Sequence, residues 1–272
     1  MQGGEKKLNI IIPIKQVPET SNVKMDEKTG TMVREGVESI INPLDLYAIE
    51  LGIQLKEEYG GKITVITMGP PSADKALREA IAMGCDDGIL ISGREFAGSD
   101  TRATSYVLAE AIKKIKDYDL ILAGERATDG DTGQVGPGIA SFLDLPVATY
   151  TSKIVEINNK NIVVERLIEE GYETLEMPLP ALLTVVKEIS YPRLPTLRGK
   201  QKAKKMDIPV WSKNNMELNE LELGLKGSPT RVVKIAHPKV VRKGTILKVS
   251  DEKTLNENVS RMIKFMHEKE LI

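Results

Sequence analysis

Strands alternate with helices along the first half of the chain, and this alternation limits the possible fold more than any other feature. Apolar segments rich in β-branched residues are each followed by a segment with helical spacing of its apolar residues. The expected strand and helix pairs are 8–17 with 42–60, 62–71 with 72–84, and 86–93 with 99–115, before a fourth strand at 119–125. Strands that alternate with helices form parallel sheets with right-handed crossovers. The sequence therefore predicts an α/β fold with a doubly wound, Rossmann-like parallel sheet.

The pattern changes after residue 146. Short strands separated by Asn-Asn, Glu-Gly and Pro turns follow, and they predict a meander that extends or flanks the sheet. The next segment, SYPRLPTLRGKQKAKKMDIPVW, is rich in proline and basic residues, and only one helix, at 254–270, is expected beyond it. Such a segment buries little of itself. We therefore predict an α/β domain over 1–190 and an extended arm over 191–272 that packs on a partner subunit.

Composition argues against several classes of protein. The 272 residues contain 38 Lys and Arg against 39 Asp and Glu, which is not the basic surplus of a nucleic-acid-binding protein. The single cysteine, Cys85, forms no intramolecular disulfide, and two histidines are too few for a typical zinc site or a histidine-based triad. There is no apolar run of about 18 residues, so we expect no transmembrane segment and a cytoplasmic protein.

The stretch GERATDGDTGQVGPGIASFL, residues 124–143, joins the fourth strand to an apolar helix expected from about Gln134. It lacks the distal glutamate of a calcium loop, the lysine of a Walker loop and the GxGxxG dinucleotide fingerprint. Gly130 and Gly133 nevertheless permit close approach of backbone amides, and the helix directs its positive end into the loop. These features favour an anion. In open parallel sheets, ligands bind at the carboxyl ends of the strands, which is where this loop lies.

Polar side chains of the same loop leave two interpretations open. Thr132 and Gln134 are able to donate further hydrogen bonds to an anion, whereas Asp129 and Asp131 are better suited to capping turns or to binding ribose hydroxyls. The alternative is a glycine-rich turn whose aspartates only cap the following helix.

Five motifs, in order along the chain, resemble the electron transfer flavoprotein β subunit. They are IKQVPET (14–20), INPLDLYAIE (41–50), VITMGPP (65–71), ATDGDTGQVGP (127–137) and YPRLPTLRGKQKAKK (191–205). The resemblance is collinear over nearly the whole chain. It implies an adenine-nucleotide-hydrolase-like variant of the predicted sheet and a nucleotide bound at the strand ends.

The resemblance also implies which residues hold the nucleotide, with the amides of Gly133 to Val135 on phosphate. The matching positions are Pro13, Asn42, Met68, Gly124, Ala127, Thr128, Asp129, Gly130, Asp131, Thr132, Gly133, Gln134 and Val135. Considered separately, Asn42 is equally well explained as a helix cap, and Met68 as a core residue at a strand end.

Two types of β subunit differ in cofactor. One holds AMP structurally, whereas the other holds FAD and takes part in electron bifurcation. The sequence Asp129-Gly130-Asp131-Thr132 resembles the second type, since glycine removes bulk beside the nucleotide. The resemblance then implies FAD, with AMP as the alternative, and NADH as electron donor. Electrons would pass to FAD on the α subunit and to ferredoxin or flavodoxin. No side chain of this chain is expected to act as a catalytic acid, base or nucleophile, and no metal is expected.

Further residues match positions at protein contacts. Arg166 corresponds to an arginine near the subunit interface, where it would stabilise an anionic flavin; a solvated strand arginine is the alternative. Leu197, flanked by Arg193, Arg198 and Lys200, matches a recognition loop that anchors a dehydrogenase partner. The implied partners are the α subunit and an acyl-CoA dehydrogenase or a quinone oxidoreductase-like flavoprotein, which would make the protein peripheral to a membrane in the latter case. A solvated basic linker is the alternative for this segment.

Two hypotheses from other classes remain open at this point. A nucleotide-binding sensor on the same type of sheet would be colourless and would exchange AMP or ATP. A structural subunit with an empty loop would tolerate Gly133→Val without any change in assembly or cofactor content.

Overall fold

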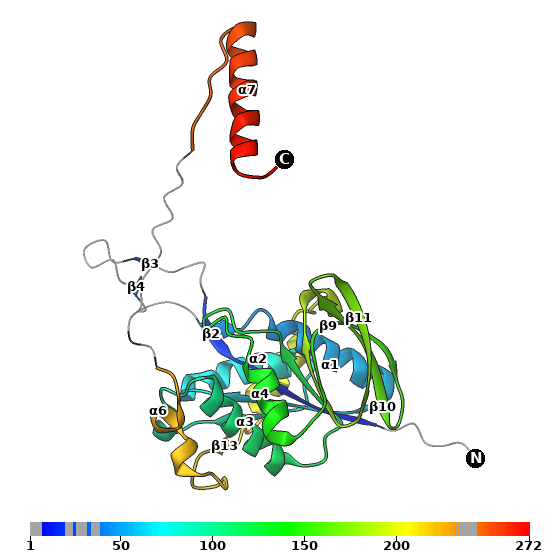
Figure 1. Ribbon diagram of the computed structural model, residues 1–272. Helices are drawn as coiled ribbons and strands as arrows, with labels where there is room; N and C mark the ends of the chain where they lie inside the picture. Colours follow the sequence, from blue (N-terminus) through cyan, green and yellow to red (C-terminus); the bar gives the residue numbers. More distant parts are fainter. Residues whose placement is uncertain (1–6, 20–23, 26–31, 34–38, 232, 234–243) are drawn as a thin grey trace. The chain divides into compact units, whose positions relative to one another are not determined.

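The computed structural model describes residues 7–19, 24–25, 32–33, 39–231, 233 and 244–272 (Figure 1). The chain forms two compact units, residues 1–231 and 232–272. The first contains a sheet of nine strands in the order β11-β10-β9-β12-β8-β1-β6-β7-β13. In chain order these are β1 (Leu8–Pro13), β6 (Gly61–Met68), β7 (Asp87–Ile91), β8 (Leu120–Gly124), β9 (Val147–Ile157), β10 (Asn161–Ile168), β11 (Gly171–Pro178), β12 (Ala181–Val185) and β13 (Val210–Trp211).

The six strands from β12 to β13 are parallel to their neighbours, whereas β9, β10 and β11 pair antiparallel and extend the sheet. Two small antiparallel pairs accompany the sheet, β2 (Gln16–Pro18) with β5 (Ser39–Ile41) and β3 (Lys24–Met25) with β4 (Met32–Val33). The fold is α/β with a large, mostly parallel sheet, which confirms the predicted class.

Helices cover both faces of the sheet. The α-helices of the first unit are α1 (Asp45–Tyr59), α2 (Asp74–Met83), α3 (Thr101–Ile115), α4 (Val135–Leu143), α5 (Leu197–Lys205) and α6 (Gly224–Gly227). Short 3₁₀ segments are η2 (Pro71–Ala73), η3 (Arg94–Phe96), η4 (Lys187–Ile189) and η5 (Glu220–Glu222). Ile10 and Ile12 of β1 pack into a core with α1 and α2, whereas Ile11 packs into a second core with α3 and α4. A strand buried on both faces explains the continuous apolar run.

Strand β12 is placed differently from the predicted meander. Only β9, β10 and β11 form an antiparallel meander, and β12 returns to lie between β8 and β9, parallel to both. All five of its residues are buried. The four buried aliphatic residues among them belong in the middle of a sheet rather than at its edge.

Residues 191–231, assigned to an arm by the sequence, pack on the sheet domain of the same chain. Helix α5 contacts α2, where the guanidinium of Arg78 donates to the carbonyl oxygens of Ala203 and Met206. Strand β13 pairs with β7 at one edge of the sheet. Contact between this part of the chain and a partner stays a prediction.

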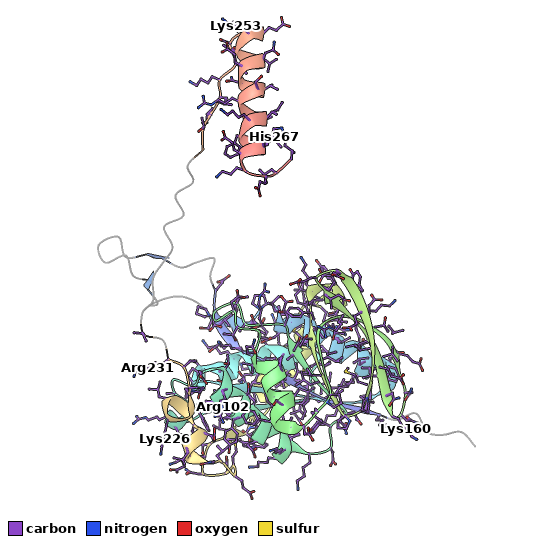
Figure 2. All side chains as sticks on the ribbon, viewed as in Figure 1. Arg102, Lys160, Lys226, Arg231, Lys253 and His267 are labelled. Carbon is purple, nitrogen blue, oxygen red and sulfur yellow. The ribbon has the colours of Figure 1, made fainter. Side chains whose placement is uncertain are left out.

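The second unit contains α7 (Glu252–Glu268), the helix expected at 254–270. Its N-terminus carries a capping box. The carboxylate of Asp251 accepts a hydrogen bond from the backbone N–H of Thr254, and the hydroxyl of Thr254 accepts one from the backbone N–H of Asp251. Lys253 and His267 mark its two ends in Figure 2. Apolar side chains at helical spacing on α7 are exposed within this unit. They are Leu255, Val259, Met262 and Ile263.

Candidate functional site

The carboxyl ends of the parallel strands lie at one edge of the sheet, as the topology requires. Pro13, Met68 and Gly124 are the last residues of β1, β6 and β8. Pro13 is buried, and Met68 is a partly buried residue packed against the core beneath α3 and α4. The loop that follows Gly124 therefore starts at this edge, and α4 begins at its far end.

Asn42 holds this loop instead of capping a helix. Helix α1 begins at Asp45, three residues later than the expected start, and no side chain caps it. The fully buried Asn42 donates from Nδ2 to the carbonyl oxygen of Arg126 at 2.9 Å, and its Oδ1 accepts from the backbone N–H of Thr128 at 3.1 Å. The side chain thus makes the backbone contacts that a loop so poor in regular structure requires.

Asp45 is a further residue of the candidate site, which the sequence interpretation missed. Its carboxylate accepts from Nδ2 of Asn42 at 2.9 Å and from the backbone N–H of Lys15 at 2.7 Å, and the backbone N–H of Gly124 also donates to it. Burial raises the pKa of Asp45 from 3.8 to about 7, against the opposing effect of these hydrogen bonds. An acidic residue in the first turn of a predicted helix, among apolar residues, was the available signal.

The two aspartates of the loop form ion pairs with basic side chains. The ammonium of Lys15 lies 2.6 Å from Oδ1 of Asp129, and Nε of Arg126 lies 2.7 Å from Oδ1 of Asp131. Helix α4 has Gln134 at its N-cap position, with no side-chain hydrogen bond there. The interpretation in which the aspartates only cap the helix is therefore wrong.

Backbone amides at the start of α4 are available to an anion. Gly133 has φ 63°, and no hydrogen bond to another described residue is found for the amides of Thr132, Gly133, Gln134 and Val135. Such amides, with the positive end of the helix dipole, form an anion site. Gly130 has open space around it, since a Cβ there would meet no heavy atom within 4 Å. The residues present fit the phosphates of a nucleotide.

Close packing fixes the position of α4. A Cβ added to Gly136 would lie 2.5 Å from Cγ2 of Thr184, and one added to Gly138 would lie 2.4 Å from Oγ of Ser105. These glycines allow α4 to approach β12 and α3 closely, which holds the amide donors in place.

Arg166 lies on β10, within the antiparallel extension. Its Nη1 is 3.7 Å from Oε2 of Glu173 on β11, and its buried Nε has no hydrogen-bond partner among the described residues. Among the described residues, no hydrogen bond or ion pair joins Arg166 to the loop after β8. Its predicted role at a flavin stays a prediction.

In the predicted recognition loop, Arg193 and Leu197 have different environments. Arg193 donates to the carboxylates of Glu50 and Glu57 on α1, and the hydrogen bonds with Glu57 and then Glu50 raise the pKa of the guanidinium. Leu197 begins α5 and is 81% exposed, with Arg198 and Lys200 exposed beside it. Arg193 thus fixes the loop to its own chain, and Leu197 is free to contact another.

Among the described parts of the chain, no three His, Cys, Asp or Glu side chains are grouped as a metal site would need. No helix there is long and apolar enough to cross a membrane.

Comparison with known families agrees with this architecture. The family model of the electron transfer flavoprotein domain matches residues 29–215. The chain belongs to the electron transfer flavoprotein family.

Relatives identify the type of subunit. Electron transfer flavoprotein subunit beta of Thermoanaerobacterium thermosaccharolyticum is 46% identical over 256 residues, covering 94% of this chain and 98% of the relative. Subunit CarD of the caffeyl-CoA reductase-Etf complex of Acetobacterium woodii is 44% identical over 266 residues, covering 97% of this chain and 100% of the relative. Protein FixA of Azotobacter vinelandii is 44% identical over 238 residues, covering 85% of each chain. This chain is an electron-transfer protein of the β-subunit and FixA type.

Proposed function

We propose that this chain binds FAD at the loop after β8 and forms, with an α subunit, a bifurcating electron transfer flavoprotein that oxidises NADH. The open space at Gly130 is the observation that favours FAD over AMP, because a longer, more negative dinucleotide needs room beside the loop. The backbone amides at the start of α4, which have no acceptor among the described residues, would supply donors for its phosphates.

When bound, FAD would supply the redox chemistry, accepting a hydride from NADH and passing single electrons to FAD on the α subunit and to ferredoxin or flavodoxin. The chain's own residues would bind the nucleotide and orient it. Asn42 and Asp45 hold the loop against the ends of β1 and β8. The amides of Gly133 to Val135 would bind phosphate, and Pro13 and Met68 would form the adjoining floor. No residue of the site needs to act as an acid or base.

Two surfaces would serve partners. The exposed apolar side chains of α7 would pack on the α subunit, since an unpartnered amphipathic helix gains stability by burying its apolar face. Leu197, with Arg198 and Lys200 around it, would anchor a dehydrogenase or a quinone oxidoreductase-like flavoprotein.

Nucleotide analysis of the purified αβ complex tests this proposal. The complex is denatured, and the released nucleotides are separated and counted per heterodimer. Two FAD and no AMP are expected. One FAD with one AMP would overturn the proposal in favour of a single-flavin carrier, and a colourless complex with exchangeable AMP or ATP would indicate a sensor. Whether NADH is the electron donor is tested by adding NADH to the intact complex, where bleaching of the flavin absorbance is expected.

A further inference from the structure

Tyr150 has a backbone conformation that is unusual for an aromatic residue. Its φ is 56°, in the left-handed region, although it lies within β9. The strand is irregular at this point, because Leu183 of β12 pairs with Ala148 and Val185 pairs with Thr151. Left-handed backbone is unfavourable for a bulky residue and often marks a functional position when the surrounding structure enforces it.

Hydrogen bonds on both sides enforce this conformation. The backbone N–H of Tyr150 donates to Oγ1 of Thr184 at 3.1 Å, and the backbone N–H of Val186 donates to the carbonyl oxygen of Thr151 at 3.1 Å. Both partners belong to the end of β12 or the residue after it. The irregularity is therefore fixed to the carboxyl end of a parallel strand, where the candidate nucleotide site lies.

The phenol of Tyr150 lies close to Gly133 in the loop. Its oxygen lies 3.8 Å from the position that a Cβ on Gly133 would occupy. The start of the loop is joined to β12, because the backbone N–H of Glu125 donates to the carbonyl oxygen of Val185 at 3.1 Å. Tyr150 is 41% exposed, and its phenol oxygen has no hydrogen-bond partner among the described residues. A polar group without a partner thus lies beside amides that also lack one.

We propose that Tyr150 is a further residue of the nucleotide site, whose phenol O–H donates a hydrogen bond to a phosphate oxygen held by the amides of Gly133 to Val135. The inference rests on the proposed function for the position of the nucleotide. The left-handed backbone at Tyr150 serves to bring the phenol from β9 past the end of β12 to the loop. A hydroxyl adds a directional donor to this set without adding charge.

The substitution Tyr150→Phe removes only the hydroxyl. The affinity of the αβ complex for the nucleotide of this subunit is measured by titration with FAD after depletion. A roughly tenfold rise in the dissociation constant is expected, with an unchanged melting temperature of the depleted complex. Tyr172→Phe is the matched control, because Tyr172 is an exposed tyrosine on β11. Unchanged affinity in Tyr150→Phe would overturn the proposal.

A second variant separates ligand binding from a structural role. Tyr150→Gly removes the phenol and relieves the left-handed strain, and it also removes the buried part of the ring, so nucleotide affinity should fall at least as far as in Tyr150→Phe whatever the change in stability of the depleted complex. Loss of stability without loss of affinity would assign Tyr150 a structural role and contradict the proposal. Should the native complex contain AMP, the proposed function fails, and the same affinities measured with AMP still test Tyr150.

Discussion

Asn42 joins Asp45 to the loop that follows β8. Its Nδ2 lies 2.9 Å from Oδ1 of Asp45 and 2.9 Å from the carbonyl oxygen of Arg126, and its Oδ1 lies 3.1 Å from the backbone nitrogen of Thr128. One buried amide therefore connects the start of α1 with a loop more than eighty residues later in the chain. Removing it takes one hydrogen-bond partner from the buried carboxylate of Asp45 and the side-chain partner from the part-buried backbone groups of Arg126 and Thr128.

The substitution Asn42→Ala should destabilise the protein by about 1–3 kcal/mol, because the buried carboxylate of Asp45 loses a donor and two part-buried backbone groups lose their side-chain partner. It should also loosen the loop and release nucleotide. Thermal unfolding and nucleotide retention of the αβ complex measure the two effects. Asn158→Ala is the control, since Asn158 caps an exposed turn with two backbone hydrogen bonds. Equal effects of both substitutions would contradict the role given to Asn42.

Stability should depend on the titration of Asp45. Its pKa is about 7 in the folded protein against 3.8 for the free group, so between these values the folded state keeps a proton that the unfolded state has lost. Stability due to this group is therefore present at low pH, falls as pH rises from about 4 to about 7, and is constant above. The expected loss amounts to a few kcal/mol.

Unfolding of the parent and of Asp45→Asn, measured at about pH 5 and about pH 8, isolates this contribution. The parent should lose stability relative to the variant between the two pH values, because asparagine does not titrate. The same pH dependence in both proteins would show that Asp45 has an ordinary pKa.

Arg193 should contribute to stability through Glu50. The side chain of Glu50 is 4% exposed, and Nε of Arg193 lies 2.9 Å from its Oε2. Arg193→Ala leaves this carboxylate buried without its cation, which should cost about 3 kcal/mol. Arg193→Lys should recover only part of the loss, since lysine cannot donate in the same fork.

Glu57→Ala provides the comparison for this pair. Glu57 also binds Arg193 but is 59% exposed, so its removal should cost less than about 1 kcal/mol. Denaturant titration of the three variants gives the free energies of unfolding. A larger effect at Glu57 than at Arg193 would contradict the assignment.

Gly130 and Gly133 should respond differently to substitution. Gly130→Ala places its methyl group in open space, so fold stability should change by less than about 0.5 kcal/mol. Gly133→Val forces a β-branched residue to adopt φ 63° and should cost about 1–2 kcal/mol and release the nucleotide. Nucleotide content after gel filtration is the measurement. An unchanged nucleotide content of the αβ complex in Gly133→Val would mean that this loop holds no nucleotide, and it would support a structural subunit with an empty loop.

The apolar face of α7 should determine assembly with the α subunit. Replacement of Val259 and Ile263 by serine should weaken association at least about 100-fold, because two aliphatic side chains would no longer be buried. The double variant Glu257→Gln with Arg261→Gln on the same helix changes charge without removing apolar area. Titration of labelled subunits gives both affinities, and an equal effect of the two double variants would argue against α7 as the contact.

Local patterns determined much of this protein. The apolar run in β1 specified a strand buried on both faces, because consecutive residues point to opposite sides of a sheet and every residue of the strand except Asn9 is apolar. The glycines of the loop and the apolar segment after it predicted a turn into a helix, and α4 begins at Val135, next to the expected Gln134.

Tertiary structure alone decided how distant segments meet. Asn42 has the sequence context of a helix cap, and only the approach of residues 126–128 gave its side chain different partners. Likewise, β12 lies beside β8 because the two strands pair, although β8 is more than fifty residues earlier in the chain. The irregularity at Tyr150 lies where β9 pairs with the other side of β12. Helical and strand periodicities depend on near neighbours in the chain, whereas these contacts depend on packing between elements far apart in sequence, which leaves no local pattern.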